Sequence, residues 1–149
     1  MNEVEALIRT LDLAPHPEGG WYRETVRQAA PGGGRGRMTA ILFLLEAGKR
    51  SHWHRVDAAE LWLWHAGSPL ALLIDNDATV ETILGAGISA GQQPQMLVPP
   101  GAWQSAEARS GWTLVSCVVT PAFEFSGFEL APPGWEPGIE RGTGGVGRG

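Results

Sequence analysis

The sequence of 149 residues has very few of the groups that form covalent cross-links or basic surfaces. It contains one cysteine, Cys117, and one lysine, Lys49. A single cysteine excludes a disulfide within the chain, and a chain without disulfides is typical of a reducing compartment. The chain has 11 basic against 16 acidic residues and a net charge of -5. No nucleic-acid partner is therefore expected, because phosphates are bound by clustered Lys and Arg.

Long apolar runs are also missing from the sequence. No run approaches the roughly 18 residues that a membrane-spanning helix needs. The first residues do not have the basic segment and following apolar segment of a signal peptide. We therefore expect a cytoplasmic protein that makes no contact with a membrane.

Glycine, proline and tryptophan are abundant instead, with 21, 11 and 7 residues. So many helix-breaking residues argue against a mainly helical bundle. The apolar fraction of 43% is sufficient for a hydrophobic core, and the length suits one domain. We predict a single domain over residues 1–136, followed by a flexible Gly-rich tail over 137–149.

Helical spacing of apolar residues occurs near the start of the chain, over residues 4–11, and Asn2 and Glu5 are placed to form a capping box before it. After this helix, short segments rich in strand-forming residues alternate with Gly- and Pro-rich turns, which predicts an all-β sandwich or barrel. The predicted strands are Trp21–Arg27, Thr39–Leu45, Glu60–His65, Leu70–Asp75, Thr79–Leu84, Gln95–Val98, Trp103–Ala106, Trp112–Val119 and Phe123–Glu129.

Titratable side chains gather around His52 and His54. If residues 52–54 are extended, both imidazoles point to the same face, because side chains in a strand alternate. Glu60 follows six residues after His54, and a paired strand could return its carboxylate to the same volume. Two imidazoles and a carboxylate can bind divalent iron, manganese, nickel or zinc. Such histidines also occur as ordinary hydrogen-bonding residues, so both interpretations stay open.

Longer motifs around these residues resemble a known family. The pattern His52-x-His54-x5-Glu60-x6-Gly67, followed by Pro99-x-Gly101-x2-Gln104, is similar to the two short motifs of the cupin superfamily. The segments 16–24 (HPEGGWYRE), 51–55 (SHWHR) and 123–131 (FEFSGFELA) resemble its DUF985 branch, also called cupin-5. The resemblance covers residues 1–136. It implies a cupin double-stranded β-helix, a barrel of the jelly-roll type.

The sequence departs from the superfamily pattern in two places. Five residues separate His54 from Glu60 where three or four are usual, and Gln104 stands where a histidine is usual. An amide oxygen is a weaker ligand for a transition metal than an imidazole. A metal held by His52, His54, Glu60 and Gln104 is therefore one alternative among several.

Without a metal, the same residues suit acid–base chemistry. Glu60 beside His54 would raise the pKa of the imidazole, which could then act as a base near neutral pH. Tyr22 would be the acid, in an arrangement that resembles cupin-type epimerases of deoxysugar nucleotides. The first hypothesis is thus an isomerase, epimerase or cyclase acting on a sugar-like or small polar metabolite. A non-catalytic protein that binds a small molecule is the second hypothesis, and a metal-dependent enzyme is the third.

Other side chains are expected to contact the ligand without taking part in the chemistry. Glu24 shares the strand face of Tyr22, and Trp62 and Phe125 lie inside the family motifs beside polar neighbours. The predicted ligand-binding residues are Glu24, His52, Trp62, Gln104 and Phe125.

Two further expectations concern Cys117 and the oligomeric state. Cys117 lies in the apolar run Trp112–Val119, which favours an inert core thiol over a nucleophile. Cupin barrels commonly pair, and the exposed strand Trp21–Arg27 is the predicted contact of a homodimer.

Overall fold

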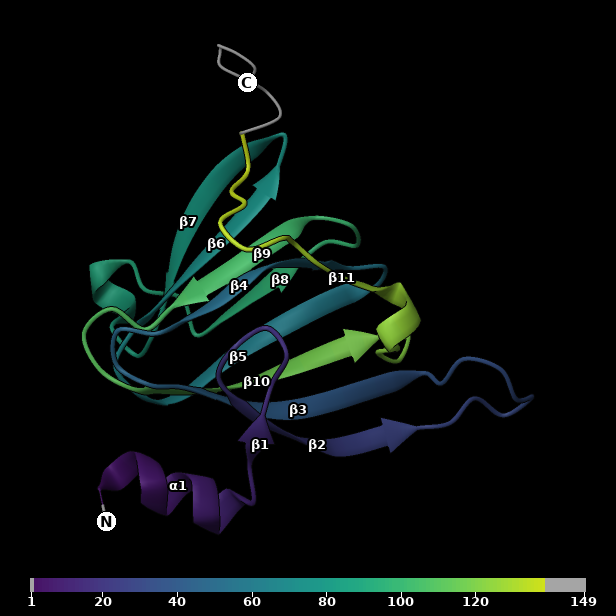
Figure 1. Cartoon of the computed structure of the whole chain (residues 1–149), viewed down its shortest axis with the longest axis horizontal. Coiled ribbons are helices and arrows are strands. Elements are labelled where there is room, and N and C mark those ends of the chain that lie inside the picture. Colours follow the sequence, from purple (N-terminus) through teal and green to yellow (C-terminus); the bar gives the residue numbers. More distant parts are fainter. Residues whose placement is uncertain (1, 139–149) are drawn as a thin grey trace.

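The computed structural model describes residues 2–138. Its elements are α1 (Glu3–Leu11), β1 (Ala14–Pro15), β2 (Trp21–Gln28), β3 (Met38–Leu45), β4 (Arg50–Val56), β5 (Ala59–Gly67), β6 (Leu70–Asn76), β7 (Ala78–Leu84), η1 (Ile88–Ala90), β8 (Gln95–Val98), β9 (Trp103–Glu107), β10 (Thr113–Thr120), η2 (Phe125–Gly127) and β11 (Phe128–Leu130). The strands form two antiparallel sheets, with the orders β1-β2-β3-β10-β5-β8 and β11-β4-β9-β6-β7 (Figure 1).

This arrangement confirms the predicted all-β architecture with one short N-terminal helix. Eight of the nine predicted strands are present, with ends that differ by no more than two residues. The ninth, Phe123–Glu129, is wrong over most of its length, because residues 125–127 form the 3-10 turn η2. A Cβ at Gly127 would lie 2.3 Å from a carboxylate oxygen of Asp57, so a larger residue there would require the Asp57 side chain to move. The predicted tail, 137–149, lies outside the described residues except for Pro137 and Gly138.

Helix α1 begins with the predicted capping box. The Asn2 side chain accepts a hydrogen bond from the Glu5 backbone N–H, and the Glu5 carboxylate accepts one from the Asn2 backbone N–H. The helix ends at Leu11 and is followed by the C-cap Asp12, whose φ of 56° places it in the left-handed region. Within residues 2–138, no helix has both the length and the apolar character needed to cross a membrane.

The hydrophobic core lies between the two sheets and toward one end of the strands. On β3, Phe43 and Leu45 are 1% exposed and belong to this core, whereas the earlier residues Thr39 and Ile41 face a pocket. The other core side chains include Trp62, Leu70, Leu72, Leu84, Val98 and Val115. The strands therefore pack tightly at one end and enclose a pocket at the other.

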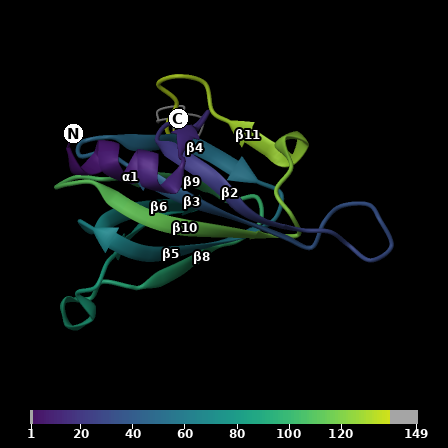
Figure 2. The same ribbon diagram turned by 90° about the horizontal axis from the view of Figure 1, so that it is seen from below.

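The loop that joins β2 to β3, residues 29–37, extends away from both sheets in the two perpendicular views (Figures 1 and 2). Arg35 in this loop binds back to the barrel. Its guanidinium donates hydrogen bonds to the Asp57 carboxylate at 2.8 and 3.1 Å and to the Ala122 carbonyl oxygen at 2.8 Å. The base of this long loop is thereby fixed beside the open end of the barrel.

Candidate functional site

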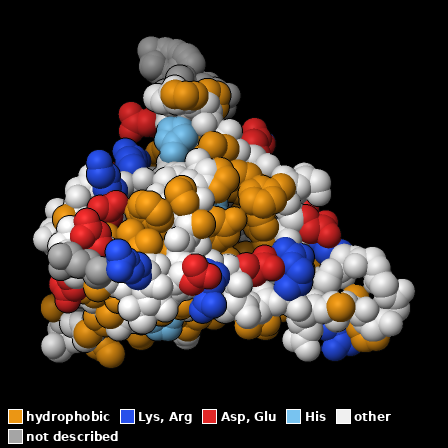
Figure 3. Space-filling view, turned by 60° about the horizontal axis from the view of Figure 1, so that its bottom comes forward, with side chains coloured by type: hydrophobic (Ala, Val, Ile, Leu, Met, Phe, Trp, Pro, Cys, Tyr) orange, Lys and Arg blue, Asp and Glu red, His pale blue; other side chains and the backbone are white. Residues whose placement is uncertain are grey.

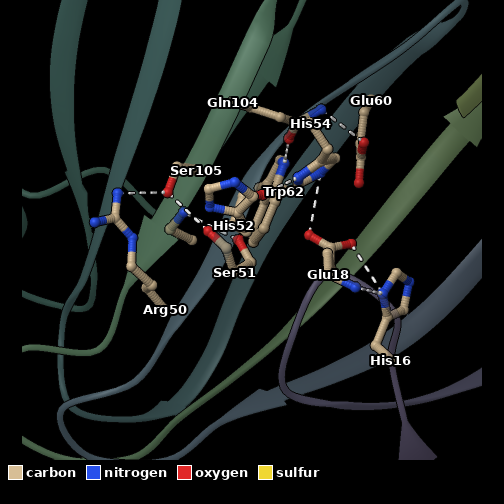
Figure 4. Close-up of polar contacts among 11 residues, drawn as sticks. His16, Glu18, Arg50, Ser51, His52, His54, Glu60, Trp62, Gln104 and Ser105 are labelled. Atoms are coloured by element: carbon tan, nitrogen blue, oxygen red, sulfur yellow. Dashed lines mark hydrogen bonds and ion pairs between the residues drawn. The ribbon is translucent and has the colours of Figure 1, made fainter. Parts of the chain in front are cut away.

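A pocket of about 550 Å³ opens at the end of the barrel opposite the core. Aromatic side chains from β2 and from the segment around η2 line part of its wall. Four of the titratable residues that line it lie close together: His16, Glu18, His54 and Glu60. Figure 4 shows the Glu18 carboxylate between the imidazoles of His16 and His54, with Glu60 on β5, which belongs to the other sheet from the His54 strand β4.

The loop between β1 and β2 brings Glu18 into the barrel. Gly19 and Gly20 follow it with φ values of 104° and 83°, which favour glycine. A Cβ at Gly19 would lie 2.8 Å from the Arg50 carbonyl oxygen, so only glycine lets the loop lie this close to β4. The His52 backbone N–H also donates a hydrogen bond to the Glu18 carbonyl oxygen at 2.7 Å. The loop is thus held against β4, and the Glu18 side chain is 8% exposed.

His54 is the most deeply buried group of the site, with 1% exposure. Its Nδ1 lies 2.8 Å from the His52 carbonyl oxygen, which can only accept, so Nδ1 carries a proton. Nε2 is directed at Glu18, whose Oε2 is 3.1 Å away. Burial lowers the pKa of His54 to about 4. The imidazole is therefore neutral at pH 7, with its lone pair on Nε2.

The pKa values of the two buried carboxyl groups, Glu18 and Glu60, are raised, whereas that of His54 is lowered. Burial, together with the charge of Glu60, raises the pKa of Glu18 well above its usual range. Burial raises the pKa of Glu60 to about 7, although hydrogen bonds from Gln104 and Cys117 act against this shift. The contact of Glu18 Oε2 with His54 does not have the geometry of a hydrogen bond, and this oxygen has no hydrogen-bond partner within residues 2–138.

His16 is the second neutral imidazole of the site. Burial, followed by the charge of His54, lowers its pKa to about 4. Its Nδ1 accepts a hydrogen bond from the Glu18 backbone N–H at 3.1 Å. The His16 ring also packs edge-on against Tyr22, with 4.4 Å between the ring centroids. His16 therefore lies between Tyr22 and the Glu18 carboxyl group at the bottom of the pocket.

Glu60 does not have the predicted role of partner to His54. Its Oε1 instead accepts a hydrogen bond of 2.9 Å from the Gln104 amide, whose own oxygen accepts one of 2.8 Å from the Trp62 indole. This chain of bonds crosses from β5 to β9, which belong to different sheets. The carboxyl group that faces His54 is that of Glu18.

His52 and His54 do not converge on one volume as predicted. The pairing of β4 with β9 shifts register between Ser51 and His54, which places an extra residue in β4 and breaks the two-residue alternation. The Nε2 of His52 donates a hydrogen bond of 2.9 Å to the Pro132 carbonyl oxygen, and His52 is not among the residues that line the pocket.

The set of metal ligands suggested by the sequence does not form. His52 is directed away from the pocket, and the oxygen of Gln104 already accepts a hydrogen bond from Trp62. Over residues 2–138, no three His, Cys, Asp or Glu side chains are grouped so that they could hold a metal ion. The side chains present therefore do not fit the metal centre that the cupin motif implies.

The remaining predicted residues are divided between the pocket and the core. Tyr22 and Glu24 both line the pocket, as expected from their shared strand face, and Glu24 forms an ion pair of 2.8 Å with Arg27. Phe125 also lines the pocket and is 58% exposed. Trp62, by contrast, is 1% exposed in the core and does not line the pocket.

Gln104 and Cys117 lie deep in the barrel. Gln104 is 1% exposed and reaches the pocket only through its bond to Glu60. Cys117 is a buried free thiol that belongs to the core cluster and also touches the pocket. Burial raises the pKa of this thiol well above its usual range, which keeps it in the unreactive protonated form.

Sequence reasoning assigned no role to His16 and Glu18. A usable signal was present, because both titratable residues lie in the segment HPEGG beside two adjacent glycines. Such glycines allow a loop to pack closely against a strand, so that a polar side chain on that loop can lie inside the barrel. The loop's place inside the barrel depends on tertiary packing, which the segment alone does not reveal.

Comparison with known proteins identifies a family. The model of Cupin_5, described as cupin superfamily (DUF985), matches residues 5–131. The chain is similar to the solved structure of protein SO0799 from Shewanella oneidensis, with 37% identity, a TM-score of 0.82, and coverage of 88% of this chain and 85% of that one. It is also similar to a hypothetical protein from Leishmania major, with 34% identity, a TM-score of 0.78, and coverage of 87% and 88%.

A more distant likeness concerns the fold alone. Oxalate decarboxylase from Bacillus subtilis is 14% identical, with a TM-score of 0.62, and the match covers 80% of this chain and 30% of that one. These likenesses confirm the cupin barrel that the sequence motifs predicted. No curated protein gives a significant match to the chain.

Proposed function

Since the chain belongs to the DUF985 family of the cupin superfamily, we propose that its barrel pocket binds a small molecule and transfers protons on it. The reaction class is that of an isomerase, epimerase or cyclase acting on a sugar-like or small polar metabolite. One observation carries this proposal: Glu18, His54 and Glu60 are 9%, 1% and 6% exposed, yet all three line an open pocket. Burying titratable groups is costly, and they gather in clefts mainly where chemistry needs them.

The neutral pair of Glu18 and His54 supplies both an acid and a base. In the proposed step, His54 Nε2 takes a proton from a substrate carbon next to a carbonyl group. The electron pair of the broken C–H bond forms a carbon–carbon double bond, and the carbonyl oxygen takes the proton of Glu18. The products are an imidazolium and a carboxylate whose nearest atoms are 3.1 Å apart, so their opposite charges stabilise each other.

Two other side chains support this chemistry. Glu60, with a pKa of about 7, exchanges protons readily near neutral pH and can return the pair to its starting state. Glu18 takes the acid role that the sequence suggested for Tyr22. The Tyr22 hydroxyl group then serves to orient the substrate from the pocket wall.

The test is deuterium incorporation from D2O into a panel of small hydroxyaldehydes, hydroxyketones and sugars, followed by proton NMR. The wild-type protein is expected to label a carbon next to the carbonyl group, and Glu18→Gln to slow labelling by about 100-fold or more. His65→Asn is the matched control, because His65 does not line the pocket. Ligand-induced shifts without any labelling would contradict catalysis and favour a non-catalytic binding protein.

A homodimer through β2 remains part of the proposal. Among the residues that the structure describes, β2 is bordered along this edge only by the two-residue strand β1, which pairs with Trp21 and Tyr22. An open strand edge of this kind favours pairing with a second chain. Light scattering should give twice the mass of 15.9 kDa, and a monomer mass at every concentration would contradict the dimer.

A further inference from the structure

Three phenylalanine rings form one corner of the pocket. The ring centroid of Phe123 lies 4.9 Å from that of Phe125 and 5.7 Å from that of Phe128, and those of Phe125 and Phe128 are 6.0 Å apart. All three residues line the pocket, and Phe125 is 58% exposed although it is large and apolar. An exposed aromatic corner of this kind is typical of a surface that a ligand covers.

Phe128 connects this aromatic corner to the buried polar groups. Its ring centroid lies 5.6 Å from that of His54 and 6.4 Å from that of His16. A ligand seated against the Phe128 ring would therefore lie next to the Glu18–His54 pair. Figure 3 shows a face of the molecule on which hydrophobic side chains gather at the centre, with acidic and basic side chains beside them.

Acidic side chains outnumber basic ones in the lining of the pocket. Its lining contains five carboxyl groups, those of Asp12, Glu18, Glu24, Glu60 and Glu124, and two guanidinium groups, those of Arg23 and Arg27. Both arginines belong to β2, and Arg27 already binds Glu24 and the Phe123 carbonyl oxygen. Among residues 2–138, neither Glu18 nor Glu60 forms an ion pair with a lysine or an arginine.

We propose that the ligand of this pocket carries an ammonium group, either a protonated amine or a quaternary nitrogen, held against the phenylalanine corner and beside Glu18. A cation is attracted to the face of an aromatic ring, and most strongly where water is excluded. The buried Glu18 Oε2, which has no hydrogen-bond partner within residues 2–138, can accept a hydrogen bond from a protonated amine, and the carboxylates of Glu24 and Glu124 supply negative charge at the pocket wall. This inference rests on the proposed function for the location of the site, and it adds the chemical class of the ligand.

The test compares choline with 3,3-dimethyl-1-butanol, which has the same shape but no charge. Each is titrated into the full-length protein, with binding followed by calorimetry and NMR. The wild-type protein should bind choline at least about 5-fold more tightly than the alcohol, since cation–π attraction is worth about 1 kcal/mol or more. Phe125→Leu and Phe128→Leu should each reduce this preference by about 3-fold or more and leave the affinity for the alcohol nearly unchanged. Leu97→Ala, an exposed apolar residue outside the pocket, is the matched control.

Phe125 is largely exposed, so Phe125→Leu should fold and can be tested even if Phe128→Leu does not fold. Glu124→Gln provides a second variant and should also weaken choline binding selectively, because it removes a carboxylate from the pocket lining beside Phe125. Equal binding of the two probes, tighter binding of the alcohol, or no binding of either would overturn the inference. Deuterium labelling without a preference for choline would overturn only the ligand class, whereas a preference for choline without labelling would overturn only the proposed catalysis.

Discussion

The two ends of the barrel use the same strands for different purposes. On β3, Phe43 and Leu45 fill the closed end, whereas Thr39 and Ile41 face the pocket. On β10, Val115 belongs to the core, whereas Val119 lines the pocket beside the buried acids. Within one continuous sheet, the residues at the closed end therefore stabilise the fold, and those at the open end surround the groups proposed for the chemistry. The closed end supplies apolar burial, and the open end can then hold Glu18 and His54 at a cost in stability.

The largest effect on activity is expected for His54→Asn, a variant at the open end of the barrel. Loss of the base should slow the proposed proton transfer by about 100-fold or more, because general acid–base catalysis contributes at least that much. The thermal midpoint should change little, since both the His54 imidazole and the Asn amide that replaces it are neutral, and His54 lines the pocket rather than belonging to the hydrophobic core. Deuterium labelling and thermal unfolding measure the two effects. Retention of full activity would remove His54 from the mechanism.

The reverse variant, Leu72→Ala, acts at the closed end. Leu72 is fully buried in the core, so its truncation should lower the free energy of unfolding by about 2–5 kcal/mol. Urea unfolding measures this loss. Below the unfolding transition, ligand affinity and labelling should match those of the wild-type protein. A comparable loss of activity in the folded variant would show that the two ends are coupled.

Glu60→Gln tests the open end through the pH dependence of the free energy of unfolding. The folded pKa of Glu60 is raised to about 7, so its protonated form favours folding, and this contribution is lost as pH rises from 4.5 through 7. The amide introduced by this substitution does not titrate, so the stability of the variant relative to wild type should increase by roughly 3 kcal/mol between about pH 4.5 and about pH 8. His16 and His54, with lowered pKa values, change stability in the opposite direction in both proteins. A constant difference across this pH range would contradict a raised pKa.

The smallest effect is expected from a surface ion pair that belongs to neither end. Arg109 binds Glu81 at 2.7 Å and Glu107 at 2.8 Å, and its side chain is half exposed. Arg109→Ala should lower the free energy of unfolding by less than about 1 kcal/mol, because water and salt screen such pairs. Urea unfolding at low and high salt checks this expectation. A loss as large as that of Leu72→Ala would show that surface charge contributes as much as the core.

The sequence predicts the closed end of the barrel better than the open end. Strand alternation and turn residues locate segments such as Leu70–Asp75, and the capping box at Asn2 and Glu5 locates the start of α1. These signals are local, so each can be interpreted without knowledge of the tertiary fold.

The open end depends on contacts that are distant in the sequence. The shift of register in β4 turns His52 away from His54, and the loop between β1 and β2 brings Glu18 to His54 from 36 residues away. Spacing within one motif therefore suggested Glu60 as the partner of His54. Trp62 was likewise expected on the pocket wall, because its motif does not reveal that its indole is bonded to Gln104 inside the core.

Carbon-13 NMR titration of the glutamate side-chain carboxyl groups shows directly whether Glu18 and Glu60 are protonated at neutral pH. The open end should hold two carboxyl groups that titrate far above the ordinary value of 4.5, with Glu60 near 7 and Glu18 also well above the usual range. Their signals are assigned by their absence in Glu18→Gln and Glu60→Gln. Titration of every glutamate near 4.5 would contradict the account, because the pocket would then lack the neutral acid on which the proposed proton transfer depends.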